Sequence, residues 1–333
     1  MLRLRPVRFC RPSTLSEAVA LLEEHGDAAA LLSGGTDLVP NLKLAQESAE
    51  VLISLQNLDE LEGVRREGDQ LCIGARTRLV DVASHPDIER TLPVLTQAVH
   101  RIASPQIRNM GTLGGNLCLD TRCRYINQSE LFRQALGGCL KSHGAECHVV
   151  PGGPGCVAAL SADSVPPLIA LKAQVVLVGS NGSRTLALKD FYNSDGLKHT
   201  NIEAGEILAE IRIPTPPATS RFTYRKWAVR KSIDFPLISM AIRLDLSDDE
   251  GPDNEPKLMD GCLVVGALGP KPKTVPLAAF AGSRIDEGLA KALGELVKKR
   301  CKPLPNIPYD PAYRRTRLGV EVKRGVLSLA EGG

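Results

Sequence analysis

Apolar residues recur along the first third of the chain with the spacings typical of short helices and strands. Residues 14–25 carry apolar side chains at helical spacing, and Thr14 followed by Glu17 forms a capping-box pattern at their start. Beyond it, two short apolar runs predict buried strands, a mixed segment predicts a strand that becomes a helix, and a periodic segment predicts a helix. In order, these segments are residues 28–32, 50–55, 70–83 and 92–103.

The remainder of the chain is richer in alternating, strand-like patterns. The predicted strands lie within residues 165–179, 181–191, 206–214, 222–229, 237–246 and 257–268. The first of these begins with a helical turn at a proline pair, and Pro216–Pro217 marks a linker between domains. The acidic residues 248–256 predict an exposed hairpin loop, and residues 289–301 and 311–330 predict helices. Helices and strands mixed without an internal repeat predict α+β domains.

Composition excludes several classes of protein. The 333 residues are 43% hydrophobic and 24% charged, which excludes a disordered chain. No apolar run approaches the roughly 20 residues of a membrane span, so we expect no membrane insertion. The net charge of +3 is too small to indicate nucleic-acid binding. Residues 1–13 have no apolar core of a secretion signal, so we expect a cytoplasmic protein.

Cysteines are the unusual feature of the composition. Of nine cysteines, five fall between residues 118 and 156, in a glycine-rich segment at about 117–160 that has no clear periodicity and predicts a loop or insertion. Clustered cysteines in a reducing compartment indicate metal or redox chemistry rather than disulfides. Four thiolates can hold zinc or an iron–sulfur cluster, and the absence of a C-x-x-C pair leaves the metal open. His143 and His148 are weaker candidate ligands, and Cys118 fits a small core residue.

Two glycine pairs are candidates for binding phosphate. Ser33–Asp37 follows a predicted strand, and Thr112–Asn116 repeats the combination of paired glycines with polar donors. Backbone N–H groups of such segments can approach a phosphate closely, and two of them could hold the two halves of one pyrophosphate. Two unrelated tight turns explain the same residues. Neither segment is the G-x-G-x-x-G pattern of dinucleotide-binding folds.

A basic strand is a further candidate for ligand contact. It contains Tyr224, Arg225, Lys226 and the only tryptophan, Trp227. A surface strand with solvated charges accounts for these residues equally well.

Four segments taken together resemble a known family. They are LLSGGTDLVPNLK, QIRNMGTLGGNL, SADSVPPLIALKA and YRKWAVRKSIDFPLISMA, and they occur in the order found in the FAD-binding subunits of molybdenum hydroxylases such as xanthine dehydrogenase and carbon monoxide dehydrogenase. The resemblance implies a two-part α+β FAD-binding domain, divided into residues 1–55 and 56–217, and a smaller C-terminal α/β domain at residues 218–333. It also implies which residues bind FAD. These are Ser33, Gly34, Gly35, Thr36, Asp37, Thr112, Gly114, Gly115 and Asn116 at the pyrophosphate, Asp163 near the isoalloxazine or ribityl group, and Lys226 near the ring.

The cysteine-rich segment departs from most of that family. The 46 residues between Asn116 and Asp163 are similar to an insertion in the β subunit of 4-hydroxybenzoyl-CoA reductases, where it carries a [4Fe–4S] cluster. The resemblance implies that the ligands of such a cluster are Cys123, Cys139, Cys147 and Cys156. Cys118 is left without a role.

The function implied by the resemblance is electron transfer. Electrons would pass between an external donor such as ferredoxin, the [4Fe–4S] cluster, FAD, a small [2Fe–2S] subunit and a large molybdopterin subunit, in a dimer of heterotrimers. Substrate would bind the large subunit, so no catalytic residue is expected in this chain. Two alternatives remain: a related enzyme acting on another aromatic or heterocyclic substrate, and a zinc-stapled binding or assembly protein without flavin.

Overall fold

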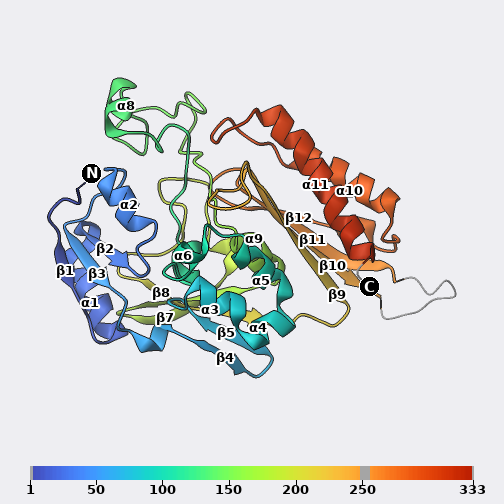
Figure 1. Ribbon diagram of the computed structural model, residues 1–333, viewed down its shortest axis with the longest axis horizontal. Helices are drawn as coiled ribbons and strands as arrows, with labels where there is room; N and C mark the ends of the chain where they lie inside the picture. Colours follow the sequence, from blue (N-terminus) through green and yellow to red (C-terminus); the bar gives the residue numbers. More distant parts are fainter. Residues whose placement is uncertain (1–2, 248–255, 332–333) are drawn as a thin grey trace.

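The computed structural model describes residues 3–247 and 256–331, and within them the chain forms three sheets with helices packed around them. The predicted hairpin loop at residues 248–256 lies almost entirely outside the described residues. Figure 1 shows the three sheets side by side in chain order, with the C-terminal helices covering one face of the last sheet. This mixture of helix and sheet confirms the α+β prediction.

The first sheet is small and parallel. Its strands are β1 (Arg8–Cys10), β3 (Val51–Ser54) and β2 (Ala29–Leu32), in that spatial order. Helix α1 (Leu15–His25) packs on this sheet, and the Thr14 hydroxyl accepts a hydrogen bond from the Glu17 amide at 3.1 Å, as the capping pattern predicts. The short helix α2 (Leu38–Lys43) follows β2 after a tight turn.

The second sheet has five strands, all antiparallel, in the order β4-β5-β8-β6-β7. The strands are β4 (Val64–Glu67), β5 (Gln70–Gly74), β6 (Gln174–Gly179), β7 (Gly182–Ala187) and β8 (Ile207–Pro214). Short helices cover one face: α3 (Leu79–Ser84), α4 (Pro86–Thr91), α5 (Pro93–His100), α6 (Pro105–Arg108), α7 (Leu113–Leu117) and α9 (Val165–Ala170). The chain between β5 and β6 carries the second glycine pair and the clustered cysteines, so both candidate sites depend on this sheet.

The third sheet is antiparallel and belongs to the C-terminal part of the chain. Its order is β12-β11-β10-β9, with β9 (Ser220–Trp227), β10 (Ile238–Leu246), β11 (Leu258–Gly266) and β12 (Lys273–Pro276). Helices α10 (Glu287–Arg300) and α11 (Pro311–Glu331) cover one face, where Ile242 and Leu263 are buried against them. The other face, through Ala241 and Val264, shares a continuous apolar core with the second sheet.

The cysteine-rich segment forms a lobe above the sheets, as Figure 1 shows at the top of the view. It is irregular as predicted except for one missed helix, α8 (Glu130–Ala135). Buried polar contacts fix the lobe to the rest of the molecule. Arg133 donates to the carbonyls of Leu44 and Ala45, at 3.0 and 2.7 Å, and the Asn306 amide donates to the Val157 carbonyl at 2.7 Å.

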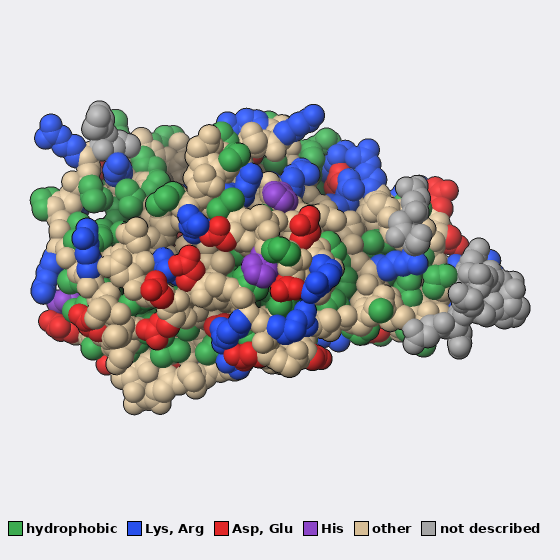
Figure 2. Space-filling view, turned by 60° about the horizontal axis from the view of Figure 1, so that its bottom comes forward, with side chains coloured by type: hydrophobic (Ala, Val, Ile, Leu, Met, Phe, Trp, Pro, Cys, Tyr) green, Lys and Arg blue, Asp and Glu red, His purple; other side chains and the backbone are tan. Residues whose placement is uncertain are grey.

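Charged side chains of both signs lie intermixed on the face of the molecule in Figure 2. Within the described part of the chain, the helices are either too short or too polar to cross a bilayer.

Candidate functional site

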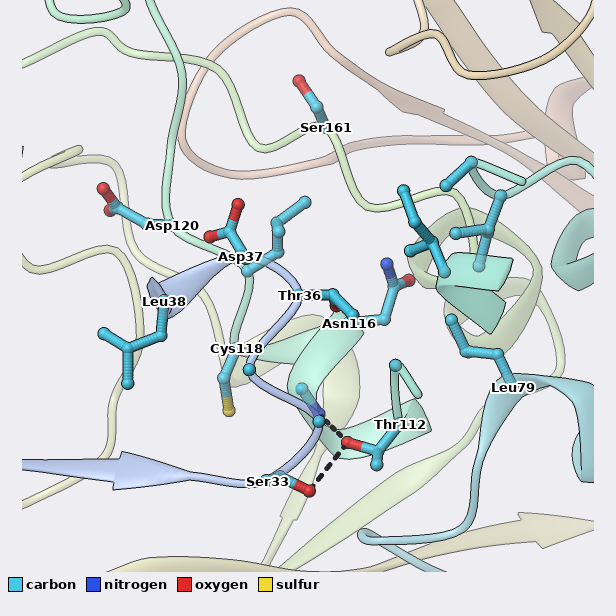
Figure 3. A pocket seen from close by; sticks show the side chains of 18 of the residues that line it. Ser33, Thr36, Asp37, Leu38, Leu79, Thr112, Asn116, Cys118, Asp120 and Ser161 are labelled. Atoms are coloured by element: carbon cyan, nitrogen blue, oxygen red, sulfur yellow. Dashed lines mark hydrogen bonds between the residues drawn. The ribbon is translucent and has the colours of Figure 1, made fainter. Parts of the chain in front are cut away.

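The two glycine segments meet at the boundary between the first and second sheets. The Ser33 and Thr112 hydroxyls lie 3.1 Å apart, and the dashed lines in Figure 3 mark this contact. A Cβ atom on Gly34 would lie 2.0 Å from the carbonyl oxygen of Met110, so only glycine permits this approach of the two backbones. Gly35 has φ +68°, which also favours glycine.

The second glycine pair lies in a helix rather than in a tight turn. Thr112 is the N-cap residue of α7, and its hydroxyl accepts a hydrogen bond from the Gly115 amide at 3.1 Å. Gly114 faces Ala75, where a Cβ would come within 2.6 Å of the Ala75 side chain. The helical conformation is therefore selected by the cap and by close packing against the end of β5, which outweigh the poor helix propensity of glycine.

A cavity of about 400 Å³ opens beside these two segments. In Figure 3 the cavity runs between Asp120 and Leu38 on one side and Leu79 on the other, with Asn116 and Thr36 between them. Of the residues that sequence reasoning assigned to FAD, those lining the cavity are Ser33, Gly34, Gly35, Thr36, Asp37, Thr112, Gly115, Asn116 and Asp163. The lining is mostly apolar elsewhere, as expected of a site that encloses a large organic cofactor.

Asp37 closes one side of the cavity through an ion pair that sequence reasoning missed. Its carboxylate pairs with Arg122 and accepts a hydrogen bond from the Asn41 amide at 3.1 Å. The Arg122 guanidinium also lies over the Phe235 ring, 4.0 Å from its centroid. Burial raises the pKa of Asp37, and the charge of Arg122 opposes that shift. The pair joins the first sheet, the lobe and the C-terminal part at the cavity.

Asp163 and Lys226 form a buried ion pair at the cavity. The carboxylate oxygens lie 2.6 Å from the Lys226 ammonium and 2.6 Å from the Tyr224 hydroxyl, and both charged side chains are 4% exposed. Lys226 also donates to the carbonyls of Arg101 and Asp234, at 2.9 and 2.8 Å. Burial raises the pKa of Asp163, and Lys226 opposes the shift. Asp163 lines the cavity, whereas Lys226 does not line it and contacts Asp163 from behind the cavity wall.

An acidic group that the sequence patterns did not single out also lines the cavity. Glu47 lines the cavity together with Asp37 and Asp120. Burial raises the pKa of Glu47 to about 7, and the neighbouring carboxylates of Asp120 and Asp37 add to this shift. These three carboxyl groups come from segments far apart in the sequence, so only the folded chain reveals the cluster.

The four cysteines assigned by resemblance line one small cavity in the lobe. Cys123, Cys139, Cys147 and Cys156 surround a space of about 20 Å³, so their side chains lie near one another. Burial raises the pKa of the Cys123 thiol to about 11, and the negative charges that the other three thiols would carry add to the shift. All nine cysteines lie in the described residues and are free thiols.

Apolar side chains surround these thiols, among them Tyr125, Ile126 and Leu140. In residues 3–247 and 256–331, no group of three or more His, Cys, Asp or Glu side chains is arranged to hold a metal ion. The described residues therefore bring the four thiols near one another without arranging them as a metal-binding group.

The remaining candidates of this segment take different places. His148 lines the cysteine cavity, where its ring nitrogen lies 2.6 Å from the Gly138 carbonyl oxygen. His143 is exposed and lines a separate open cavity between the lobe and the first sheet. Cys118 lines the large cavity beside the glycine segments, and burial raises its pKa to about 12. A protonated thiol is therefore expected there.

Comparisons with known proteins agree on one family. A family described as "FAD binding domain in molybdopterin dehydrogenase" matches residues 5–216. The nicotinate dehydrogenase FAD-subunit of Eubacterium barkeri is 31% identical over 264 residues, which cover 78% of this chain and 75% of that protein. The carbon monoxide dehydrogenase medium chain of Hydrogenophaga pseudoflava is 29% identical over 315 residues, 95% of this chain and 94% of that one.

Solved structures share the fold of this chain. A chain of the carbon monoxide dehydrogenase of Hydrogenophaga pseudoflava superposes with a TM-score of 0.78 at 26% identity, covering 99% of both chains. The quinoline 2-oxidoreductase of Pseudomonas putida shares the fold, with a TM-score of 0.77 over 99% of both chains at 22% identity.

Proposed function

We propose a specific electron-relay role for this chain, which belongs to the family of FAD-binding domains in molybdopterin dehydrogenases and is the flavoprotein subunit of a molybdenum-dependent oxidoreductase. Its cofactor is FAD, which when bound exchanges electrons singly or in pairs. The finer role is that of a flavin and [4Fe–4S] subunit. The observation that carries it is the enclosure of one small cavity by Cys123, Cys139, Cys147 and Cys156.

The large cavity is the proposed place of FAD. Ser33–Asp37 and Thr112–Asn116 would hold its pyrophosphate through backbone N–H groups and the Ser33 and Thr112 hydroxyls, which lie side by side. Asp163 would accept a hydrogen bond from the isoalloxazine or ribityl part, and Lys226 would orient that carboxylate. We further propose that the cofactor lies between residues 1–55 and 56–217, with residues 218–333 closing one side.

The cysteine cavity is the proposed place of a [4Fe–4S] cluster. Four free thiols facing one space under an apolar cover suit such a cluster. A single zinc ion would need all four sulfur atoms within about 2.3 Å of one centre, whereas an iron–sulfur cube spreads them farther apart. Because the space measures only about 20 Å³, we expect the surrounding loop, with its glycines, to open outward around the cluster.

The partners follow from the family. Carbon monoxide dehydrogenase medium chains and nicotinate dehydrogenase FAD-subunits are parts of larger enzymes by name, so we propose a large molybdopterin subunit and a small [2Fe–2S] subunit in a dimer of heterotrimers. In a 4-hydroxybenzoyl-CoA reductase-like enzyme, a reduced ferredoxin-type carrier supplies single electrons. At the large subunit, two electrons and two protons would then replace the phenolic hydroxyl by hydrogen and release water. We propose that this assembly works in the cytoplasm.

A second function has support of its own. The relatives include a nicotinate dehydrogenase FAD-subunit and a caffeine dehydrogenase subunit, both named for heterocyclic substrates. A molybdenum hydroxylase acting on such a substrate would use this same FAD cavity, and electrons would leave through this chain. The cysteine cavity favours the first function because the relay through FAD alone makes no use of four converging thiols.

Metal and flavin analysis of the purified holoenzyme tests the proposal. We expect flavin absorption near 450 nm, about four iron atoms per copy of this chain beyond those of the [2Fe–2S] subunit, and matching acid-labile sulfide. Zinc in place of this iron, with flavin present, would reject the cluster and leave the FAD role. Zinc without flavin would reject both the cluster and the assignment of the large cavity to FAD.

A further inference from the structure

Lys141 links the wall of the cysteine cavity directly to the wall of the FAD cavity. Its side chain lines the cysteine cavity, two residues beyond Cys139. Its ammonium nitrogen lies 2.6 and 2.7 Å from the two carboxylate oxygens of Asp120, which lines the FAD cavity. Figure 3 shows Asp120 at the edge of that cavity, on the side of Asp37. A single ion pair therefore spans the wall between the two sites.

The ammonium is held in a fixed position. Besides Asp120, it donates to the Thr121 hydroxyl at 2.9 Å and to the Thr121 carbonyl at 3.2 Å. The Thr121 hydroxyl in turn donates to the Gly196 carbonyl at 2.8 Å. The Lys141 side chain is only 10% exposed, so water and salt screen its charge weakly. A buried charge in such a place acts on its neighbours more strongly than a surface lysine does.

Groups that can carry negative charge lie on both sides of this cation. On the FAD side stand the carboxyl groups of Asp37, Glu47 and Asp120. On the other side stand the four cysteines, whose cavity Lys141 also lines. On the FAD side, the Asp37 carboxylate pairs with Arg122 and the Asp120 carboxylate pairs with Lys141.

We infer that Lys141 is a cation shared by the two redox sites, which raises the reduction potential of the cluster and neutralises Asp120 at the FAD cavity. The inference rests on the proposed cluster. Adding an electron to a thiolate-bound cluster adds negative charge, and a fixed cation nearby stabilises the reduced form. Lys141 is thus a positioning and tuning residue: it sets the charge balance and ties the lobe to the FAD wall.

Redox titration of the holoenzyme, followed by EPR for the cluster and by absorption for FAD, tests the inference with two variants of opposite sign. Lys141→Met removes the cation, so we expect the midpoint potential of the cluster to fall and FAD to be retained less tightly. Asp120→Asn removes the counter-charge and leaves the cation, so we expect the cluster potential to rise. Mere structural damage would not move the potential in opposite directions.

Two controls complete the experiment. Lys141→Arg keeps the positive charge, so the cluster potential and the retention of FAD should stay close to those of the wild type. Lys198→Met removes an exposed lysine and should leave both measurements unchanged. If Lys141→Met and Asp120→Asn retain their iron but leave the cluster potential unshifted, or shift it in the same direction, the inference about Lys141 is wrong. The proposed function would not be affected by that result. Wild-type enzyme without the additional iron would instead reject the proposed function on which it rests. If Lys141→Met does not fold, the cluster potential of Asp120→Asn still tests the inference, because a rise is expected and an unchanged or lower potential would overturn it.

Discussion

The FAD cavity and the cysteine lobe are built by different means. The cavity is formed where regular elements end: the end of β2, the cap of α7 and the approach of two backbones at Gly34 and Met110. The lobe is mostly irregular and is fixed by polar side chains that bond to backbone carbonyls, above all Arg133. A site made by packed backbone tolerates little change in shape, whereas a lobe fixed by single side chains can be detached by one substitution.

Gly34→Val should give the largest effect on cofactor binding and stability, and the loss of cofactor should concern FAD alone. A Cβ at this position would meet the Met110 carbonyl oxygen at 2.0 Å, so the two glycine segments would be forced apart. We expect loss of bound FAD and destabilisation of about 3 kcal/mol. Flavin content and thermal unfolding check this result. Gly269→Ala is the matched control, because its Cβ would meet open space. Wild-type flavin content in Gly34→Val would contradict the assigned contact.

Arg133→Met should destabilise the lobe and leave the FAD cavity unchanged. The side chain is 5% exposed, and its loss leaves carbonyls of the lobe and of residues 44–45 without their donor. We expect a local destabilisation of about 2 kcal/mol, seen as faster hydrogen exchange over residues 124–150, with lower iron content and unchanged flavin. Exposed Arg230 offers the control Arg230→Met. Equal exchange rates in the lobe of both variants would show that Arg133 does not anchor it.

Glu47→Gln should give an effect on stability that depends on pH. The pKa of Glu47 is raised from its ordinary value of 4.5 to about 7, so the folded chain holds this proton more tightly than the unfolded chain. The contribution of Glu47 to stability is therefore full below pH 4.5 and is lost as the pH rises through about 7. The glutamine variant should lack this loss and gain at most about 3 kcal/mol relative to wild type at pH 8. Urea denaturation at pH 5 and pH 8 measures the difference, and parallel pH profiles for the two proteins would refute it.

Sequence patterns predicted the long and regular elements well. The periodicity of residues 92–103 and 311–330 corresponds to α5 and α11, and each strand predicted at 222–229, 237–246 and 257–268 is present. Apolar spacing records which face of an element is buried, so these elements could be identified without knowledge of the fold. The predictions failed for α8, whose Leu131 and Phe132 face solvent at 77% and 44% exposure and so give no amphipathic pattern.

The site could be predicted only where neighbours in the sequence carry it. The paired glycines of each segment are adjacent in the sequence, so both segments could be recognised as candidates. Arg122 and Glu47 reach the FAD cavity from distant segments, and no local pattern marks them. Likewise, the cysteine spacing indicated metal or redox chemistry, but the convergence of the four thiols is a property of the folded lobe.

Comparison of Cys139→Ser with wild type tests most directly the claim that this chain holds two separate redox sites. The cysteine cavity and the glycine segments are formed by different residues, so we predict loss of the iron assigned to the lobe, while flavin content stays at the wild-type level. Cys118→Ser, at the FAD cavity, is the matched control and should keep its iron. Wild-type iron content in purified Cys139→Ser would contradict the account.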